Sequence, residues 1–180
     1  MCVLAITLFS GCASGPSIYV NADPSATFAT YRTYNFVTPM GTDGPGYSSM
    51  LSQYLRQATS RELEARGYQR SDNPDLLVNF NLQTRDKIQT TTTPSAPQYG
   101  GYYGYRTAGH YGTWGGYDTQ VTQYTEGTLS LDIVDAARMQ LAWEGTAVGR
   151  VREKNRSNLK PVVDKLIAQF FENYSYRAAP

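Results

Sequence analysis

Hydrophobic and polar positions alternate in two parts of the chain. In residues 76–83, Leu76, Val78, Phe80 and Leu82 take every second position. The same period recurs in residues 129–133 and 139–143, on either side of the turn-forming residues 135–138. A period of two buries one face of a strand and leaves the other face wetter. The pattern therefore predicts a strand over 76–83 and, later, an antiparallel hairpin.

A helix is predicted before these strands, because apolar residues recur there at helical spacing. Residues 48–67 place Leu51, Leu55 and Ala58 near helical spacing. We expect the helix to begin after Ser48, whose hydroxyl suits an N-cap, and to end at Gly67, which accepts the left-handed conformation that often closes a helix. Tyr68 should then fold back onto the core.

A second helix is predicted near the C-terminus, after a cap at Ser157 or Asn158. Its apolar residues are spaced by three or four positions and form one stripe, which should lie on a sheet. The stripe consists of Leu159, Val163, Leu166, Ile167, Phe170 and Tyr174.

The order of these elements predicts the fold class. Two further strands are expected near 17–21 and 34–37, before the first helix. We expect an α+β fold, a two-layer sandwich in which two main helices pack on one face of a mostly antiparallel sheet. One domain is predicted over 17–176.

A long loop is predicted over residues 89–117, first rich in Thr and Pro and then in Tyr and Gly. Such a loop is uncommon in a compact domain unless it is functional or disordered. Its aromatic rings suit a binding surface, although rings in a flexible insertion also serve as local packing over a sheet. The candidate binding residues are Tyr99, Tyr102, Tyr103, Tyr105, Arg106, Tyr111, Trp114 and Tyr117.

The N-terminal run 3–9 is apolar and ends in Ser10, Gly11 and Cys12. We interpret residues 1–11 as a lipoprotein signal peptide, Cys12 as the lipidated residue and 12–16 as a tether. No basic residue precedes the run, which suggests that the true start lies upstream. An ordinary signal peptide, or a buried strand with an incidental cysteine, is the alternative. Since no Asp follows Cys12, we expect an outer-membrane anchor facing the periplasm.

The composition of the chain limits which partners it can bind and which catalytic or metal-binding groups it can offer. The net charge of +1 disfavours nucleic acid as a partner. With Cys2 removed and Cys12 acylated, the mature chain has no thiol for a disulfide, a metal site or a nucleophile. His110 is the one histidine, and it lies in the predicted loop. We therefore expect no catalytic residue, no metal and no cofactor.

We interpret the charged residues in the second half of the chain as structural or solvated residues and not as a catalytic site. Asp132 and Asp135 should point to opposite faces of a strand, so with Glu144 they do not predict a catalytic carboxylate pair. Asp132 fits a solvated face and Asp135 fits a turn. The basic run 150–160 is interpreted as a solvated connection, with contact to lipid phosphates as the alternative.

Several short motifs are spread along most of the chain after residue 30. They are Tyr31–Phe36, Leu63–Tyr68, Asn73–Val78, Gly127–Asp135, Leu141–Gly145 and Ile167–Phe171 with Tyr174. Together they resemble the domain-of-unknown-function 4136 family of small bacterial envelope lipoproteins. The resemblance implies a fold and a location, and it supplies no catalytic residues.

These observations favour a non-enzymatic envelope lipoprotein that acts as a binding or assembly module. It would be held in the membrane by the lipid on Cys12 and would bind an envelope protein or glycan through the open face of the sheet or the tyrosine-rich loop. Two alternatives remain. One is an enzyme acting on envelope glycan or lipid, and the other is a structural subunit of an envelope complex.

Overall fold

The computed structural model describes residues 15–94, 117–152 and 157–180. The chain forms an α+β fold, as the sequence predicts. The elements in chain order are β1 (Ser17–Ala22), the short 3-10 helix η1 (Phe28–Thr30), β2 (Thr33–Phe36), α1 (Met50–Glu64), β3 (Gln69–Arg70), β4 (Leu76–Pro94), β5 (Tyr117–Asp135), β6 (Gln140–Arg150) and α3 (Leu159–Glu172).

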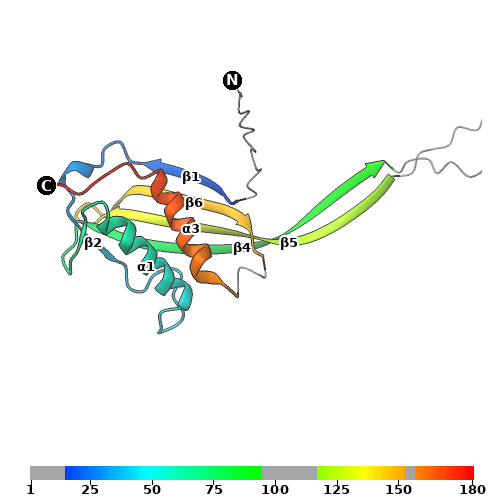
Figure 1. The fold of residues 1–180 in the computed structure, drawn as a ribbon, viewed down its shortest axis with the longest axis horizontal. Helices are drawn as coiled ribbons and strands as arrows, with labels where there is room; N and C mark the ends of the chain where they lie inside the picture. Colours follow the sequence, from blue (N-terminus) through cyan, green and yellow to red (C-terminus); the bar gives the residue numbers. More distant parts are fainter. Residues whose placement is uncertain (1–14, 95–116, 153–156) are drawn as a thin grey trace, which may run out of the picture. The chain divides into compact units, whose positions relative to one another are not determined.

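The strands form a six-stranded sheet in the order β1-β6-β5-β4-β2-β3. β6 pairs antiparallel with both β1 and β5, whereas β2 pairs parallel with β3 and β4. The helices α1 and α3 lie on the same side of the sheet (Figure 1). The two-layer arrangement is therefore confirmed. Within the described ranges, no helix combines the length and the apolar character needed to cross a bilayer.

Asp75 holds the parallel part of the sheet together. Its Oδ2 atom accepts hydrogen bonds from the backbone N–H groups of Arg32 and Thr33, at 2.8 and 2.9 Å, and from the Thr33 hydroxyl at 2.9 Å. Burial alone would raise the pKa of Asp75, but these bonds outweigh burial and lower the pKa. The carboxylate thus ties the entry of β4 to β2.

The core lies between the sheet and the two helices. Leu76, Val78 and Phe80 of β4 are fully buried, as the alternation predicts. Leu82, the fourth residue of the predicted face, is 45% exposed, so the buried part of the strand ends at Phe80. The α3 stripe is confirmed over Val163, Ile167 and Phe170, which are buried, with Leu166 at its margin. Tyr174 is also buried, but it lies beyond the end of α3 at Glu172. Further buried residues from the sheet and its flanks are Tyr34, Phe36, Leu129, Leu131, Ile133, Trp143 and Tyr174.

The ends of α1 differ slightly from the prediction. The N-cap is Ser49 and not Ser48, since Ser49 Oγ accepts from the backbone N–H of Ser52 at 3.0 Å and donates to the Thr42 carbonyl at 2.8 Å. Contact with the preceding loop selects between two neighbouring serines. Gly67 has a φ of +90°, as its predicted role requires, and Tyr68 is buried.

The chain divides into two compact units, one of residues 1–84 with 126–180 and one of residues 85–125. In the second unit, Asp86 Oδ1 accepts from the Thr125 hydroxyl at 2.7 Å, and Thr93 Oγ1 donates to the Asp118 carbonyl at 3.4 Å. Residues 89–94 are strand and not loop, because β-branched Thr favours extended backbone and ladder hydrogen bonds need no burial. Residues 95–116 of the predicted loop lie outside the described residues.

Candidate functional site

The face of the sheet opposite the helices is polar in its central strands. Side chains alternate along each strand, so the residues between the buried ones point away from α1 and α3. In β5, Ser130 and Asp132 alternate with buried Leu129, Leu131 and Ile133. We define the polar patch as Tyr19 and Asn21 of β1, Asn81 of β4, Ser130 and Asp132 of β5, and Glu144 and Thr146 of β6.

Strand register arranges the patch in rows. Asn21 lies opposite Glu144, and Glu144 lies opposite Asp132. In the next row, Tyr19 lies opposite Thr146, which lies opposite Ser130. Tyr19 is 61% exposed, and the four β5 and β6 side chains are half-buried. Carboxylates, an amide, hydroxyls and an exposed aromatic ring are therefore presented side by side on one surface.

Hydrogen bonds link several members of the patch. Asn81 Nδ2 donates to Asp132 Oδ2 at 3.1 Å. Thr146 Oγ1 donates to Glu144 Oε1 at 3.3 Å, and the hydroxyls of Ser130 and Thr146 lie 3.4 Å apart. Because a carboxylate has about four acceptor positions, these bonds leave Asp132 and Glu144 able to accept further donors.

The two carboxylates oppose each other electrostatically. Partial burial raises the pKa of Asp132, the charge of Glu144 raises it further, and the hydrogen bond from Asn81 lowers it in part. Like charges directly opposite on adjacent strands destabilise a sheet. The pair thus costs the fold stability when both groups are ionised.

We expect Asp132→Asn to stabilise the protein at pH 7, by about 0.5–1 kcal/mol in the free energy of unfolding. Because folding raises the pKa of Asp132, its contribution to stability is present in acid and is lost as pH rises through the folded-state pKa. The gain from the substitution should therefore vanish in acid, where the wild-type carboxyl is protonated. Urea unfolding at pH 3.5 and pH 7 checks this, with Asp72→Asn in an exposed turn as the charge-matched control.

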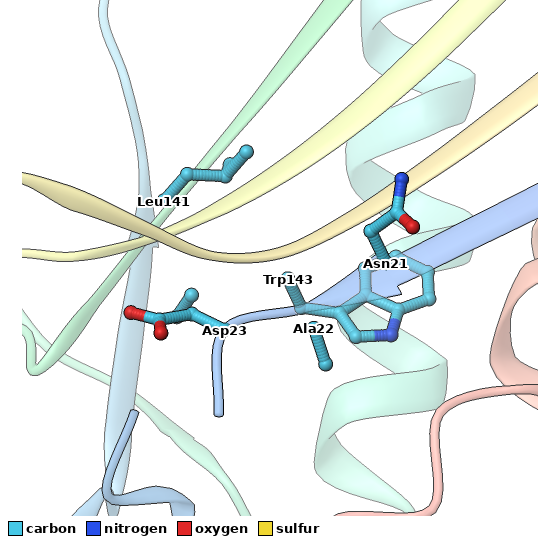
Figure 2. A pocket seen from close by; sticks show the side chains of 6 residues that line it. Asn21, Ala22, Asp23, Leu141 and Trp143 are labelled. Atoms are coloured by element: carbon cyan, nitrogen blue, oxygen red, sulfur yellow. The ribbon is translucent and has the colours of Figure 1, made fainter. Parts of the chain in front are cut away.

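A hollow of about 240 Å³ lies where β1 ends and β6 begins (Figure 2). Asp23 is the ionisable residue in its lining. Hydrogen bonds from the backbone and hydroxyl of Ser25 lower the pKa of Asp23, and Arg138 lies 3.9 Å away. A carboxylate held ionised in this way is a poor proton donor. The hollow is lined by Asn21, Ala22, Asp23, Leu141, Ala142 and Trp143.

A second hollow of about 420 Å³ includes Arg66 and Arg177. Arg66 is committed to structure, since its guanidinium donates to the Phe171 carbonyl at 2.7 Å and to Glu62 Oε2 at 2.7 Å. Arg66 therefore ties the end of α1 to the end of α3 and is not free to hold an anion.

Asp135 is buried and also structural. It accepts from the Tyr31 hydroxyl at 2.6 Å, from Arg138 Nε at 2.8 Å and from the backbone N–H groups of Ala137 and Arg138 at 3.0 and 2.9 Å. Its place at the hairpin turn agrees with the sequence interpretation. The sequence did not indicate its burial or its partner Tyr31.

The residues predicted as sites are mostly not described. Cys12, His110 and the loop residues Tyr99, Tyr102, Tyr103, Tyr105, Arg106, Tyr111 and Trp114 lie outside the described residues. Tyr117 begins β5. Sequence reasoning missed the pairing of Asp132 with Glu144, which follows only from the strand register. Among the described residues, no group of three His, Cys, Asp or Glu side chains is arranged to hold a metal ion.

Comparisons with known proteins give one family and several solved structures of similar fold. The family model described as "Domain of unknown function (DUF4136)" matches residues 18–175. A comparison with curated proteins gives no match. A PDZ domain protein from Parabacteroides distasonis is similar with a TM-score of 0.55 and 13% identity, over 91% of this chain and 37% of that one. This chain thus spans little more than a third of that protein, and the likeness shows the fold alone.

Two other structures have lower scores. The PelC dodecamer from Paraburkholderia phytofirmans has a TM-score of 0.48 and 12% identity, over 90% of this chain and 99% of that one. A minor lipoprotein from Acinetobacter baumannii has a TM-score of 0.40 and 11% identity, over 82% of this chain and 93% of that one.

Proposed function

Since the chain belongs to the DUF4136 family, whose description assigns no function, we propose its role from its own residues. We propose a non-enzymatic envelope lipoprotein, anchored through Cys12 in the outer membrane and facing the periplasm. Its polar patch binds a ligand that offers several hydrogen-bond donors, such as an envelope glycan or a protein segment rich in hydroxyl or amino groups.

The N-terminal sequence supports the anchor. An apolar run ends in Ser10-Gly11-Cys12, and small residues before a cysteine suit cleavage and acylation. One acyl chain holds a protein only marginally, whereas several chains hold it stably. Residues 13–16 then lead into β1, so the folded part begins close to the proposed anchor.

The opposed carboxylates Asp132 and Glu144 are the observation that carries the binding role. Their repulsion costs stability, and such costs are typical of functional sites. A ligand that donates hydrogen bonds to both carboxylates would relieve the repulsion. Asn21 and Asn81 flank the pair with amides, and exposed Tyr19 offers a ring face on which a sugar or an alkyl chain can lie.

Two observations favour binding over catalysis. Acid–base catalysis works best in a concave site that excludes water. Neither hollow described above includes Asp132 or Glu144 in its lining. The carboxylates instead lie on the face of a sheet, an arrangement suited to recognition.

Site-specific photocrosslinking in intact cells tests the binding role. A benzophenone amino acid at Tyr19 should give an adduct with the ligand. The same probe at Tyr47 should give none, although Tyr47 is equally exposed, at 66% against 61%. The double variant Asp132→Asn, Glu144→Gln should reduce the Tyr19 adduct at least about tenfold, since both charged acceptors are lost.

Two results would count against the proposal. One is equal labelling from Tyr19 and Tyr47, which indicates surface proximity only. The other is a Tyr19 adduct that persists undiminished in the double variant. An adduct with the mass of two copies of this chain reports self-association and not a ligand.

A further inference from the structure

Among the strands that the structure describes, β1 is an edge strand with one unpaired side. It pairs with β6 on one side and is the last strand of the sheet on the other. Its six residues, Ser17–Ala22, include no charged residue and no proline. Charges and prolines are the usual means by which natural proteins block an exposed edge. The edge of β1 is therefore open to a further strand.

The hydrogen-bond pattern shows which residues face the free side. Asp23 N donates to the Ala142 carbonyl at 2.9 Å, which continues the β1–β6 ladder. Because hydrogen-bonded pairs alternate in an antiparallel ladder, Asn21 and Tyr19 also bond to β6. The N–H and C=O groups of Ile18, Val20 and Ala22 then point away from β6. Within the described residues, β6 is the one strand that pairs with β1, so these groups have no ladder partner.

We propose that this edge pairs antiparallel with the β1 edge of a second copy of the chain, centred on Val20. In that register Ile18 lies opposite the second copy's Ala22, and Val20 lies opposite Val20. Every outward-facing residue then meets another outward-facing residue, and each such pair exchanges both backbone hydrogen bonds. The free edge is thus complementary to itself, as a twofold interface requires.

The pairing extends the polar patch. Tyr19 and Asn21 project from the helix-free face, and in this register Tyr19 lies directly opposite the second copy's Asn21. The two patches meet along the paired strands, so the rows of Asp132, Glu144 and Asn21 continue across the twofold axis. The helices of both copies lie on the other side of the extended sheet.

The proposed anchor favours a second copy of the chain as the partner of the free β1 edge. This step rests on the proposed function. Anchoring confines all copies to one membrane surface and raises their effective concentration. The paired β1 strands begin about 20 Å apart, from six residues at about 3.4 Å each. Residues 13–16 span up to about 14 Å when extended, so both anchors reach one leaflet.

Cysteine pairing tests the register. Tyr19→Cys and Asn21→Cys chains carrying different tags are co-expressed at full length and oxidised mildly, both in membranes and after purification. Directly opposite, non-hydrogen-bonded positions have Cα atoms about 4.5 Å apart, within disulfide range. We expect a reducible dimer carrying both tags. Tyr47→Cys with Asn21→Cys, and chains without new cysteines, are the controls.

A proline variant tests the edge independently. Ala22→Pro removes an N–H that faces the free side and leaves the β6 ladder intact, and the Ala22 side chain is exposed. Sedimentation of the purified full chain should show a dimer dissociation constant raised at least about tenfold, with an unchanged circular dichroism spectrum.

The proposal is overturned if the mixed pair yields no more dimer than the Tyr47 control. It is also overturned if Tyr19→Cys chains link only to each other, or if Ala22→Pro stays folded and dimerises as before. Because the purified chain is tested as well as the membrane, the edge pairing can be judged even if the proposed lipid anchor proves wrong.

Discussion

Asp135→Asn should lower the free energy of unfolding by about 2 kcal/mol at pH 7. Burial would raise the pKa of this carboxyl, but hydrogen bonds from Tyr31 and Arg138 outweigh burial and hold the pKa at about 2, against an ordinary value of 3.8. Each factor of ten in proton affinity corresponds to about 1.4 kcal/mol. The substitution removes the charge and leaves Arg138 Nε without its anionic partner.

The stabilisation by Asp135 should depend on pH. Because the folded-state pKa lies below the unfolded value, the stabilisation is complete above about pH 4 and is lost as pH falls towards 2. Urea unfolding of wild type and Asp135→Asn should therefore converge in acid. Tyr31→Phe is the control, since it removes one donor and keeps the charge, and it should cost about 1 kcal/mol. Equal stability of wild type and Asp135→Asn at pH 7 would refute the role of this carboxylate.

Gly145→Ala should destabilise the fold by about 2 kcal/mol. A Cβ atom at Gly145 would lie 2.7 Å from Trp143 Cη2 and 2.9 Å from Phe170 Cδ1. Both rings are buried, so they have little room to move. Overpacking of a filled core typically costs about 1–3 kcal/mol. The absence of a side chain at Gly145 thus lets α3 lie close against β6.

Gly149→Ala in the same strand is the matched control. A Cβ atom there would lie 3.2 Å from Pro16 Cβ, in the segment directly before β1. We expect a change below about 0.5 kcal/mol, as for most surface substitutions. Thermal and urea unfolding of both variants measure the difference. A Gly145→Ala protein as stable as Gly149→Ala would contradict the close packing of α3 on the sheet.

Much of the fold could be predicted because burial leaves a period in the sequence. The stripe of Val163, Ile167 and Phe170 and the alternation of Leu76, Val78 and Phe80 each predicted the face that the structure buries. The parallel pairing of β2 with β4 left no such period. It depends on the crossover through α1 and on Asp75, whose partners Arg32 and Thr33 are more than forty residues away.

The candidate site could not be predicted from spacing because a β-bulge shifts the register. Near the turn, Val134 lies opposite Leu141 and Asp135 opposite Gln140. An unbroken ladder would place Asp132 opposite Trp143. The irregularity beside Ile133 instead leaves Ala142 as the extra residue and places Asp132 opposite Glu144. The sequence showed that Asp132 lies on the polar face, but not which residue it meets.

The continuation of β4 through residues 89–94 shows a second limit of prediction from the sequence. Residues 89–94 are rich in Thr and poor in apolar residues, so the hydrophobic pattern favoured a loop. β4 nevertheless continues to Pro94, because backbone pairing with β5 supplies hydrogen bonds without a buried face. A hydrophobic period predicts only strands that bury one face, so it cannot predict a strand that is held by backbone hydrogen bonds alone.

The lipid anchor is the claim on which the proposed location and the class of ligand depend. Mass spectrometry of the protein isolated from its native host tests it most directly. We predict a mature chain that begins at Cys12, with acyl chains on its sulfur and its amino group. An unprocessed chain in which Cys12 carries a free thiol would contradict the account.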